Sequence, residues 1–261
     1  EAPLTLKVPT RTTSLLPSKA RQPPRPQPAA HAAPVECREM DHAGSGYTVC
    51  TVDVAEADLR LFLYDGKGEV LGQFGAIDRV LEPEGKALVF AMNAGMYHPD
   101  RAPVGHYVEK GEEVMRVVPG PGPGNFGLVP NGVFCIREDR ADVMETQAFL
   151  DAAPDCDFAT QSGPMLVIDG ELHPRFLPDS TSRYVRNGVG TSADGQRAVF
   201  AISRNAVTFH EFGSLFRDVL KMPNALYFDG NISRLYAADL GRSDAGFAMG
   251  PVVGVVAPQA N

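Results

Sequence analysis

The sequence predicts a single α+β domain with mixed or largely antiparallel sheets and a few flanking helices. Three observations predict this class: many short apolar runs typical of strands, few stretches with helical periodicity, and no strict alternation between the two. A doubly wound parallel sheet would require that alternation. The chain has 261 residues, 44% of them hydrophobic, which is enough for a core of its own. It contains no run of apolar residues long enough to predict a transmembrane segment.

The predicted strands are short runs rich in Val, Ile, Phe and Tyr, separated by Gly, Pro and Asp. In chain order they span residues 47–54, 59–64, 87–92, 133–136, 165–168, 198–202 and 225–228.

The longest predicted helix runs from Phe209 to Met222, where apolar residues recur on one face. Thr208 and Glu211 have the spacing of a capping box at its start. Shorter helices are predicted near residues 77–81 and 145–150.

The first 34 residues differ in composition from the rest. They hold eight of the 22 prolines and show neither strand nor helix periodicity, which predicts a disordered tether before a folded domain over residues 35–261. The chain begins at Glu1 rather than Met, and Ala30-His31-Ala32 resembles a cleavage site without an apolar region before it. We therefore expect any signal peptide to have been removed already.

Charge is distributed unevenly between these two parts. Residues 1–34 carry five basic side chains and one acidic side chain, whereas residues 35–261 carry 19 basic and 31 acidic ones. An acidic body disfavours nucleic acid as a partner, because neutralising phosphates requires a basic surface. A small anionic substrate remains compatible with this charge if a few arginines gather in one cleft.

The four cysteines contain no CxxC pair, which favours two disulfides over a zinc ribbon or a redox dithiol. Three pairings are possible, of which Cys37 with Cys50 and Cys135 with Cys156 close the shortest loops. Disulfides imply an oxidising compartment, so we expect a secreted or periplasmic protein. The alternative is four reduced, buried thiols in a cytosolic protein.

Several common site motifs are missing from the sequence. The six histidines lack HExxH spacing, and we predict neither a metal site nor a cofactor. The prolines of the segment 119–127 lack N–H donors and no GK[ST] follows, so we predict a surface loop, a rim or lid, rather than a phosphate loop. Neither Ser162 nor Ser182 lies in GxSxG, which disfavours a serine hydrolase.

Polar side chains gather in three places, two of which are at the ends of predicted strands. Asn93 ends a strand and enters a loop with Gly95, where the alternative is an ordinary strand-to-loop junction. Residues 180–190 concentrate hydroxyl and guanidinium groups suited to an oxyanion, where the alternative is a solvated turn. Asp229 follows a strand that would hold its carboxylate rigidly, where the alternative is a hairpin turn.

Four blocks follow one another along the chain: Asn93-Ala94-Gly95-Met96-Tyr97 with Pro103-Val104-Gly105, then Gln161-Ser162-Gly163-Pro164-Met165-Leu166, then Arg186-Asn187-Gly188-Val189-Gly190, then Asp229-Gly230. In this order and spacing they resemble the phosphodiester glycosidase family, over residues 37–256. The resemblance is closest to its secreted or periplasmic bacterial branch. It implies a hydrolase that cleaves the glycosidic C1–O bond of a sugar-1-phosphodiester, with a phosphorylated carbohydrate as substrate.

The resemblance and the residue types suggest a role for each side chain. Arg186, with Arg183 and Ser182, would bind the departing phosphate, and Asp229 would stabilise the oxocarbenium-like centre as nucleophile or as base for water. Side chains that hold sugar hydroxyls would be Asn93, Tyr97 and Gln161, and those that assist proton transfer His98, His210 or Glu211. The remaining predicted substrate contacts are Gly105, Ser162, Asn187, Gly230 and Asn231.

Asn231 departs from the family pattern, in which a second glycine follows Asp-Gly. A non-catalytic module that binds a glycan or envelope component is therefore the alternative function, consistent with Asn231 and with the N-terminal tether. Attack at phosphorus ranks last, because it usually involves a two-metal cluster that the sequence lacks. The sequence predicts no oligomeric state.

Overall fold

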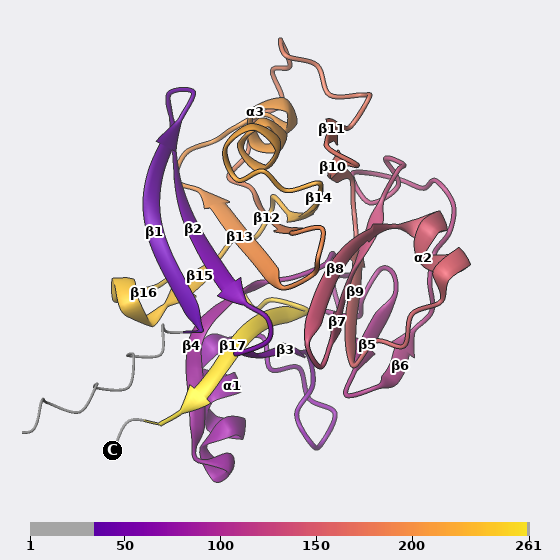
Figure 1. Ribbon diagram of the computed structural model, residues 1–261. Coiled ribbons are helices and arrows are strands. Elements are labelled where there is room, and N and C mark those ends of the chain that lie inside the picture. Colours follow the sequence, from indigo (N-terminus) through magenta and orange to yellow (C-terminus); the bar gives the residue numbers. More distant parts are fainter. Residues whose placement is uncertain (1–33, 260–261) are drawn as a thin grey trace, which may run out of the picture. The chain divides into compact units, whose positions relative to one another are not determined.

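The computed structural model describes residues 34–259, which form one compact unit of 17 strands and three short α-helices (Figure 1). The strands form three sheets in which every pairing is antiparallel. The predicted α+β class is confirmed. The predicted tether, except Pro34, lies outside the described residues.

The largest sheet has seven strands in the order β1-β2-β13-β12-β14-β10-β11. In it, Val199 and Phe200 of β13 point to opposite faces, and both are buried. Because each face packs against a core, the strand has no polar side and appears in the sequence as a continuous apolar run. The seven strands of this sheet are β1 Val35–His42, β2 Ser45–Asp53, β13 Arg197–Ser203, β12 Asn187–Thr191, β14 Asn224–Asp229, β10 Met165–Ile168 and β11 Glu171–Leu172.

The other two sheets have five strands each. One consists of β16 Arg242–Ser243, β15 Leu235–Ala237, β4 Lys86–Asn93, β17 Val252–Pro258 and β3 Asp58–Phe62. The other consists of β6 Glu112–Met115, β5 Tyr107–Glu109, β9 Phe158–Ser162, β7 Gly132–Arg137 and β8 Arg140–Glu145.

One central core joins all three sheets, with Phe200, Phe90 and Phe134 contributed by the three in turn. Each sheet then buries its other face under a helix of its own. Helix α1 Phe74–Leu81 covers the sheet of β4, α2 Thr146–Ala152 the sheet of β7, and α3 Phe209–Ser214 the seven-stranded sheet (Figure 1). This layering explains why few helices suffice for a chain with many strands.

All seven predicted strands are present, with ends shifted by at most two residues. The helix predicted to reach Met222 ends as an α-helix at Ser214 and continues as a π-helical turn over Leu215–Val219. Its capping box is confirmed, because Thr208 and Glu211 exchange side-chain and backbone hydrogen bonds.

Strand β12 was not among the predicted strands, because its residues were described only as part of a segment rich in functional groups. The glycines of β12 are not typical of a strand sequence, but they allow close packing against the neighbouring strand. A Cβ on Gly188 would lie 2.5 Å from the carbonyl oxygen of Leu226 on the neighbouring strand.

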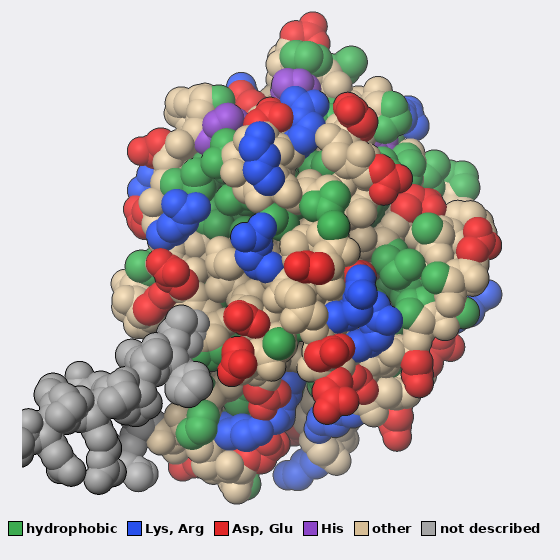
Figure 2. Space-filling view, in the orientation of Figure 1, with side chains coloured by type: hydrophobic (Ala, Val, Ile, Leu, Met, Phe, Trp, Pro, Cys, Tyr) green, Lys and Arg blue, Asp and Glu red, His purple; other side chains and the backbone are tan. Residues whose placement is uncertain are grey.

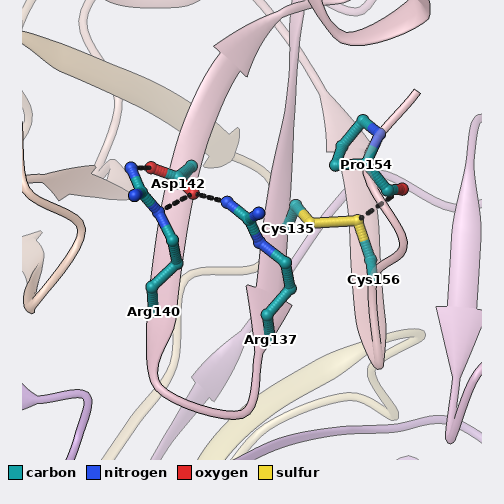
Figure 3. Close-up of a disulfide and its surroundings, with 6 residues drawn as sticks. All are labelled: Cys135, Arg137, Arg140, Asp142, Pro154 and Cys156. Carbon is teal, nitrogen blue, oxygen red and sulfur yellow. Dashed lines mark hydrogen bonds and ion pairs between the residues drawn. A yellow bond between two sulfur atoms is a disulfide. The ribbon is translucent and has the colours of Figure 1, made fainter. Parts of the chain in front are cut away.

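Both predicted disulfides are present. Cys37 and Cys50 are paired directly across β1 and β2. Cys135 on β7 is joined to Cys156, whose sulfur faces the carbonyl of Pro154 (Figure 3). Figure 3 also shows Asp142 between Arg137 and Arg140 on the same hairpin.

No helix within residues 34–259 is both long and apolar enough to cross a bilayer. Acidic and basic side chains are interspersed over the face seen in Figure 2. The absence of a nucleic-acid partner stays a prediction.

Candidate active site

A cavity of about 530 Å³ lies where loops from the three sheets meet. The loop after β4 supplies Tyr97 and His98, and the Gly-rich loop before β7 supplies residues 123–126. The loop before β12 supplies Ser182 and Tyr184. The end of β14 and the turn after it supply Tyr227 and the predicted residues Asp229, Gly230 and Asn231. The prediction that residues 119–127 form a loop is confirmed.

Among residues 34–259, Asp229 is the one carboxylate on the cavity wall. It ends β14, and its Oδ1 accepts hydrogen bonds from the backbone amides of Gly230 (2.6 Å) and Asn231 (2.9 Å). Its Oδ2 takes no part in these two bonds. Burial raises the pKa of Asp229 above its ordinary value, although the backbone amides of Asn231, Gly230 and Ile232 oppose this shift. The turn does not start a hairpin, because β14 and the next strand, β15, belong to different sheets.

Two buried asparagines fix the backbone beneath Asp229. Asn93 and Asn187 are fully buried, and each donates to the other: Asn93 Nδ2 to Asn187 Oδ1 (3.1 Å), and Asn187 Nδ2 to the Asn93 carbonyl (2.8 Å). The amide of Asp229 donates to Asn187 Oδ1 (3.2 Å), and that of Arg234 to Asn93 Oδ1 (2.9 Å). Neither asparagine lines the cavity. They therefore support the site rather than form its surface.

Tyr97 lines the cavity, and its hydroxyl is unpaired. The oxygen is buried and has no hydrogen-bond partner among residues 34–259. Burial, and next the charge of Asp229, raise the pKa of Tyr97. Because this oxygen is closed off from solvent, other atoms of Tyr97 line the cavity. His98 beside it is exposed and lines the same cavity.

Arg186 lies behind the cavity wall rather than on it. Its side chain is fully buried, with Nε donating to the Val207 carbonyl (2.9 Å) and Nη2 to the Ser182 carbonyl (3.2 Å). The guanidinium carbon lies 3.7 Å from the ring centre of Phe209 and 5.4 Å from those of Tyr184 and Tyr227. Sequence reasoning expected Arg186 and Asp229 to face one shared hollow. Asp229 does face it, but the two tyrosines separate Arg186 from it.

The charge of Arg186 is not balanced by an acid. Its Nη1 has no hydrogen-bond partner within the described part of the chain, and its other two nitrogens bind carbonyls. Burial lowers the pKa of the guanidinium, and Tyr227 partly offsets this effect. A buried cation of this kind creates a positive potential in the adjacent cavity.

Arg183, His210 and Glu211 do not line the cavity. Arg183 forms a bidentate ion pair with Glu211 (2.6 and 2.9 Å), which also caps α3. Although partial burial opposes it, hydrogen bonds from Arg183 and from the Thr208 amide hold the pKa of Glu211 below its ordinary value. The predicted roles of these three in phosphate binding and proton transfer have no support from their positions.

Gln161 is buried and makes four hydrogen bonds within the protein. Its Oε1 accepts from the amides of His106 and Val118 (3.0 Å each), while Nε2 donates to the Val118 carbonyl (2.8 Å) and to Thr146 Oγ1 (3.2 Å). No donor or acceptor remains for a sugar. Gln161 instead anchors the start of the Gly-rich loop that lines the cavity.

Ser162 and Gly105 also lie beneath the cavity surface. Ser162 is fully buried and donates to the carbonyl of Phe228 (2.9 Å). A Cβ on Gly105 would lie 2.5 Å from Gln161 Oε1 and 2.6 Å from the ring of Phe126. Glycine at 105 therefore allows the close approach of two elements.

Asn231 is exposed and lines the cavity beside Gly230. Its backbone does not have a positive φ, so asparagine fits at this position without the strain that the loss of a glycine would bring elsewhere.

Sequence reasoning assigned no role to Tyr184, Tyr227, Asn125 or Phe126, all of which line the cavity. Tyr227 was counted among apolar strand residues, and Asn125 and Phe126 among loop residues. The signal that could have identified these residues is their position, because each lies within or next to a segment that the sequence analysis singled out.

Residues 34–259 hold no cluster of three or more His, Cys, Asp or Glu side chains placed to bind a metal ion.

Comparison with known proteins agrees with this architecture. The sequence profile of the phosphodiester glycosidase family matches residues 86–255, and the chain belongs to this family. It is 34% identical over 186 residues to YigE of Escherichia coli K12, an uncharacterized protein, covering 71% of this chain and 72% of that one.

Solved structures share the fold at low identity. The catalytic domain of zebrafish N-acetylglucosamine-1-phosphodiester alpha-N-acetylglucosaminidase, auto-inhibited by its pro-peptide, aligns with a TM-score of 0.61 at 13% identity, over 87% of this chain and 84% of that one. A putative exported protein of Burkholderia pseudomallei aligns with a TM-score of 0.52 at 12% identity, over 81% and 74%.

Proposed function

We propose that this protein is a hydrolase that cleaves the glycosidic C1–O bond of a sugar-1-phosphodiester. The observation that carries the proposal is the pairing of Asp229 on the cavity wall with the uncompensated charge of Arg186 just behind that wall. A carboxylate suits the developing cation at C1, and a positive potential suits the departing phosphate. The zebrafish enzyme of the same fold, an N-acetylglucosamine-1-phosphodiester alpha-N-acetylglucosaminidase, supports this reaction class.

The chemistry requires little general acid. When C1–O breaks, the electron pair stays on the oxygen of a phosphate monoester, which is already a stable anion. The larger task is charge stabilisation. Asp229 acts either as nucleophile at C1 or as base for the attacking water. Its raised pKa brings it closer to neutral pH, which favours proton transfer from water.

The aromatic side chains of the cavity suit a sugar. Tyr97 lines the cavity, and Tyr184 is about half exposed (49%) on another segment of the wall. Sugar rings stack on aromatic faces, and their hydroxyls form hydrogen bonds with polar side chains. In this proposal Tyr97, His98 and Ser182 contact the substrate, and Asn93, Asn187, Gln161 and Ser162 hold the loops in place.

We place the protein in the periplasm or outside the cell, because its two disulfides persist in oxidising compartments.

The test is a panel of sugar-1-phosphodiesters incubated with the wild-type chain and with Asp229→Asn, with and without chelator. We expect free sugar from the wild type and a loss of at least about 100-fold in Asp229→Asn. Water labelled with ¹⁸O should place the label on the sugar. Label on the phosphate would mean attack at phosphorus, and tight binding without any product would mean a non-catalytic binding module.

A further inference from the structure

We infer that Tyr227 is a catalytic residue that donates its hydroxyl hydrogen bond to the departing phosphate, and that Arg186 is a positioning residue that acts through it. This inference rests on the proposed function and names the group that binds the substrate's phosphate. It replaces direct contact by Arg186, which the fold keeps off the cavity surface.

Tyr227 is the cavity-lining residue best placed to carry the effect of Arg186 to a ligand. It belongs to β14, two residues before Asp229, and both residues line the cavity. Its hydroxyl lies against the backbone of Gly230, where a Cβ would collide with it. The charges of both Arg186 and Asp229 act on this hydroxyl.

The hydroxyl is held in its protonated form. Burial raises the pKa of Tyr227 far above its ordinary value, although Arg186 and Asn125 oppose the shift. Neither the Arg186 guanidinium nor the Asn125 amide nitrogen can accept the phenol's proton. A phosphate oxygen in the cavity can accept this hydrogen bond, and a neighbouring cation strengthens the phenol as a donor.

A stack of rings prevents Arg186 from reaching the cavity by itself. His173 stacks on Phe176 (4.9 Å between ring centres), Phe176 on Phe209 (5.1 Å), and Phe209 on the guanidinium (3.7 Å). Phe209 also packs edge-on against Tyr227 (4.8 Å). The guanidinium is therefore held among Phe209, Tyr184 and Tyr227, and the two tyrosines line the cavity.

The proposed step transfers no proton from Tyr227. The C1–O bond breaks, its electron pair remains on the phosphate oxygen, and the negative charge that develops there accepts a stronger hydrogen bond from the phenol. Because this bond strengthens as charge develops, its loss should lower kcat more than it raises KM.

The test compares Tyr227→Phe with Tyr47→Phe. Both tyrosines are buried in the core beneath α3, but Tyr47 does not line the cavity. With a sugar-1-phosphodiester that the wild type hydrolyses, we expect kcat to fall by about 10- to 100-fold in Tyr227→Phe with a smaller change in KM, and to be unchanged in Tyr47→Phe. The affinity for inorganic phosphate should fall in parallel. Wild-type kcat and phosphate affinity in Tyr227→Phe would overturn the inference.

A double-mutant cycle tests the role of Arg186. Arg186→Met should lower kcat strongly in the wild type, and by a smaller factor in the Tyr227→Phe background. Equal effects in both backgrounds would show that Arg186 does not act through Tyr227. Thermal melts of the three variants report whether each one folds.

The two proposals fail differently. A wild type that hydrolyses no phosphodiester contradicts the proposed function. Phosphate binding then still decides whether Tyr227 forms an anion contact, because it is measured without turnover.

Discussion

Asp229 is a carboxylate that the fold buries although burial disfavours its ionised form. Its side chain is half-buried, two backbone amides bind one of its oxygens, and no basic side chain pairs with it among the described residues. Ionisation of Asp229 therefore lowers the free energy of unfolding, and this decrease can be measured.

We predict that Asp229→Asn removes activity and raises the melting temperature at neutral pH. The pKa of Asp229 is raised in the folded state, so the unfolded chain loses its proton at lower pH. Between the two pKa values the folded state binds more protons, and stability falls as pH rises. Asparagine keeps the Oδ1 acceptor without the charge. Thermal melts from pH 3 to 8 should show the gain of the variant disappearing below about pH 4. A variant less stable than the wild type at pH 7 would contradict this.

The requirement for glycine at position 230 comes from a neighbouring side chain. It does not come from the backbone of Gly230, because its φ is not positive. We predict that Gly230→Ala destabilises the wild type by about 1–3 kcal/mol, because the new Cβ collides with the Tyr227 hydroxyl. In Tyr227→Phe the colliding atom is gone, so the same change should cost little. Denaturant unfolding of the four variants measures the coupling. An equal cost in both backgrounds would rule out this collision.

At the scale of elements, the Gly-rich loop is positioned by one side chain from β9. Gln161 binds both the amide and the carbonyl of Val118, just before residues 119–127. Its four hydrogen bonds are internal, so its effect on function passes through the loop.

We predict that Gln161→Leu raises KM for a phosphodiester and lowers the free energy of unfolding. The change leaves buried polar groups of Val118 and His106 without partners, at about 1–3 kcal/mol for each group. Gln147→Leu, at an exposed position on α2, is the matched control and should change neither quantity. Unchanged KM in Gln161→Leu would mean that the loop keeps its place without this anchor.

The strands that sequence reasoning found are those with continuous apolar runs, such as Met165–Ile168, whose ends were predicted without error. Strand β12 was missed because its glycines serve packing against a neighbour that the sequence does not reveal. Strand β17 was also missed, although its valine run is a strand signal.

The sequence segments that form the site could be predicted, but which of their side chains reach the cavity surface could not. Asp229, Tyr97 and Gly230 were found and lie on the cavity wall. That Arg186 and Asn93 lie behind it depends on which faces of β12 and β4 are covered by other sheets, and a single sequence does not contain this information.

On the scale of the whole molecule, three sheets share one core, and each disulfide lies within a single sheet or beside it. The class of the fold followed from composition and pattern. The sheet order did not, because pairings such as β2 with β13 join segments far apart in the chain.

We predict that reduction of both disulfides lowers the melting temperature while leaving the cavity formed at 25 °C. Cys37–Cys50 and Cys135–Cys156 span 13 and 21 residues, loops worth about 3 kcal/mol each in the chain-entropy model. Thermal melts with and without reductant measure the loss, and a variant with all four cysteines replaced by serine, insensitive to reductant, is the control. An identical melting temperature in both conditions would show that these links are dispensable.

The reciprocal bonds between Asn93 and Asn187 join the end of a strand in one sheet to the start of a strand in another. A chain in which either sheet has formed alone has neither this pair nor a fixed Asp229. Recovery of turnover after dilution from denaturant would therefore time the docking of the two sheets, and it should lag behind the return of strand signal in circular dichroism.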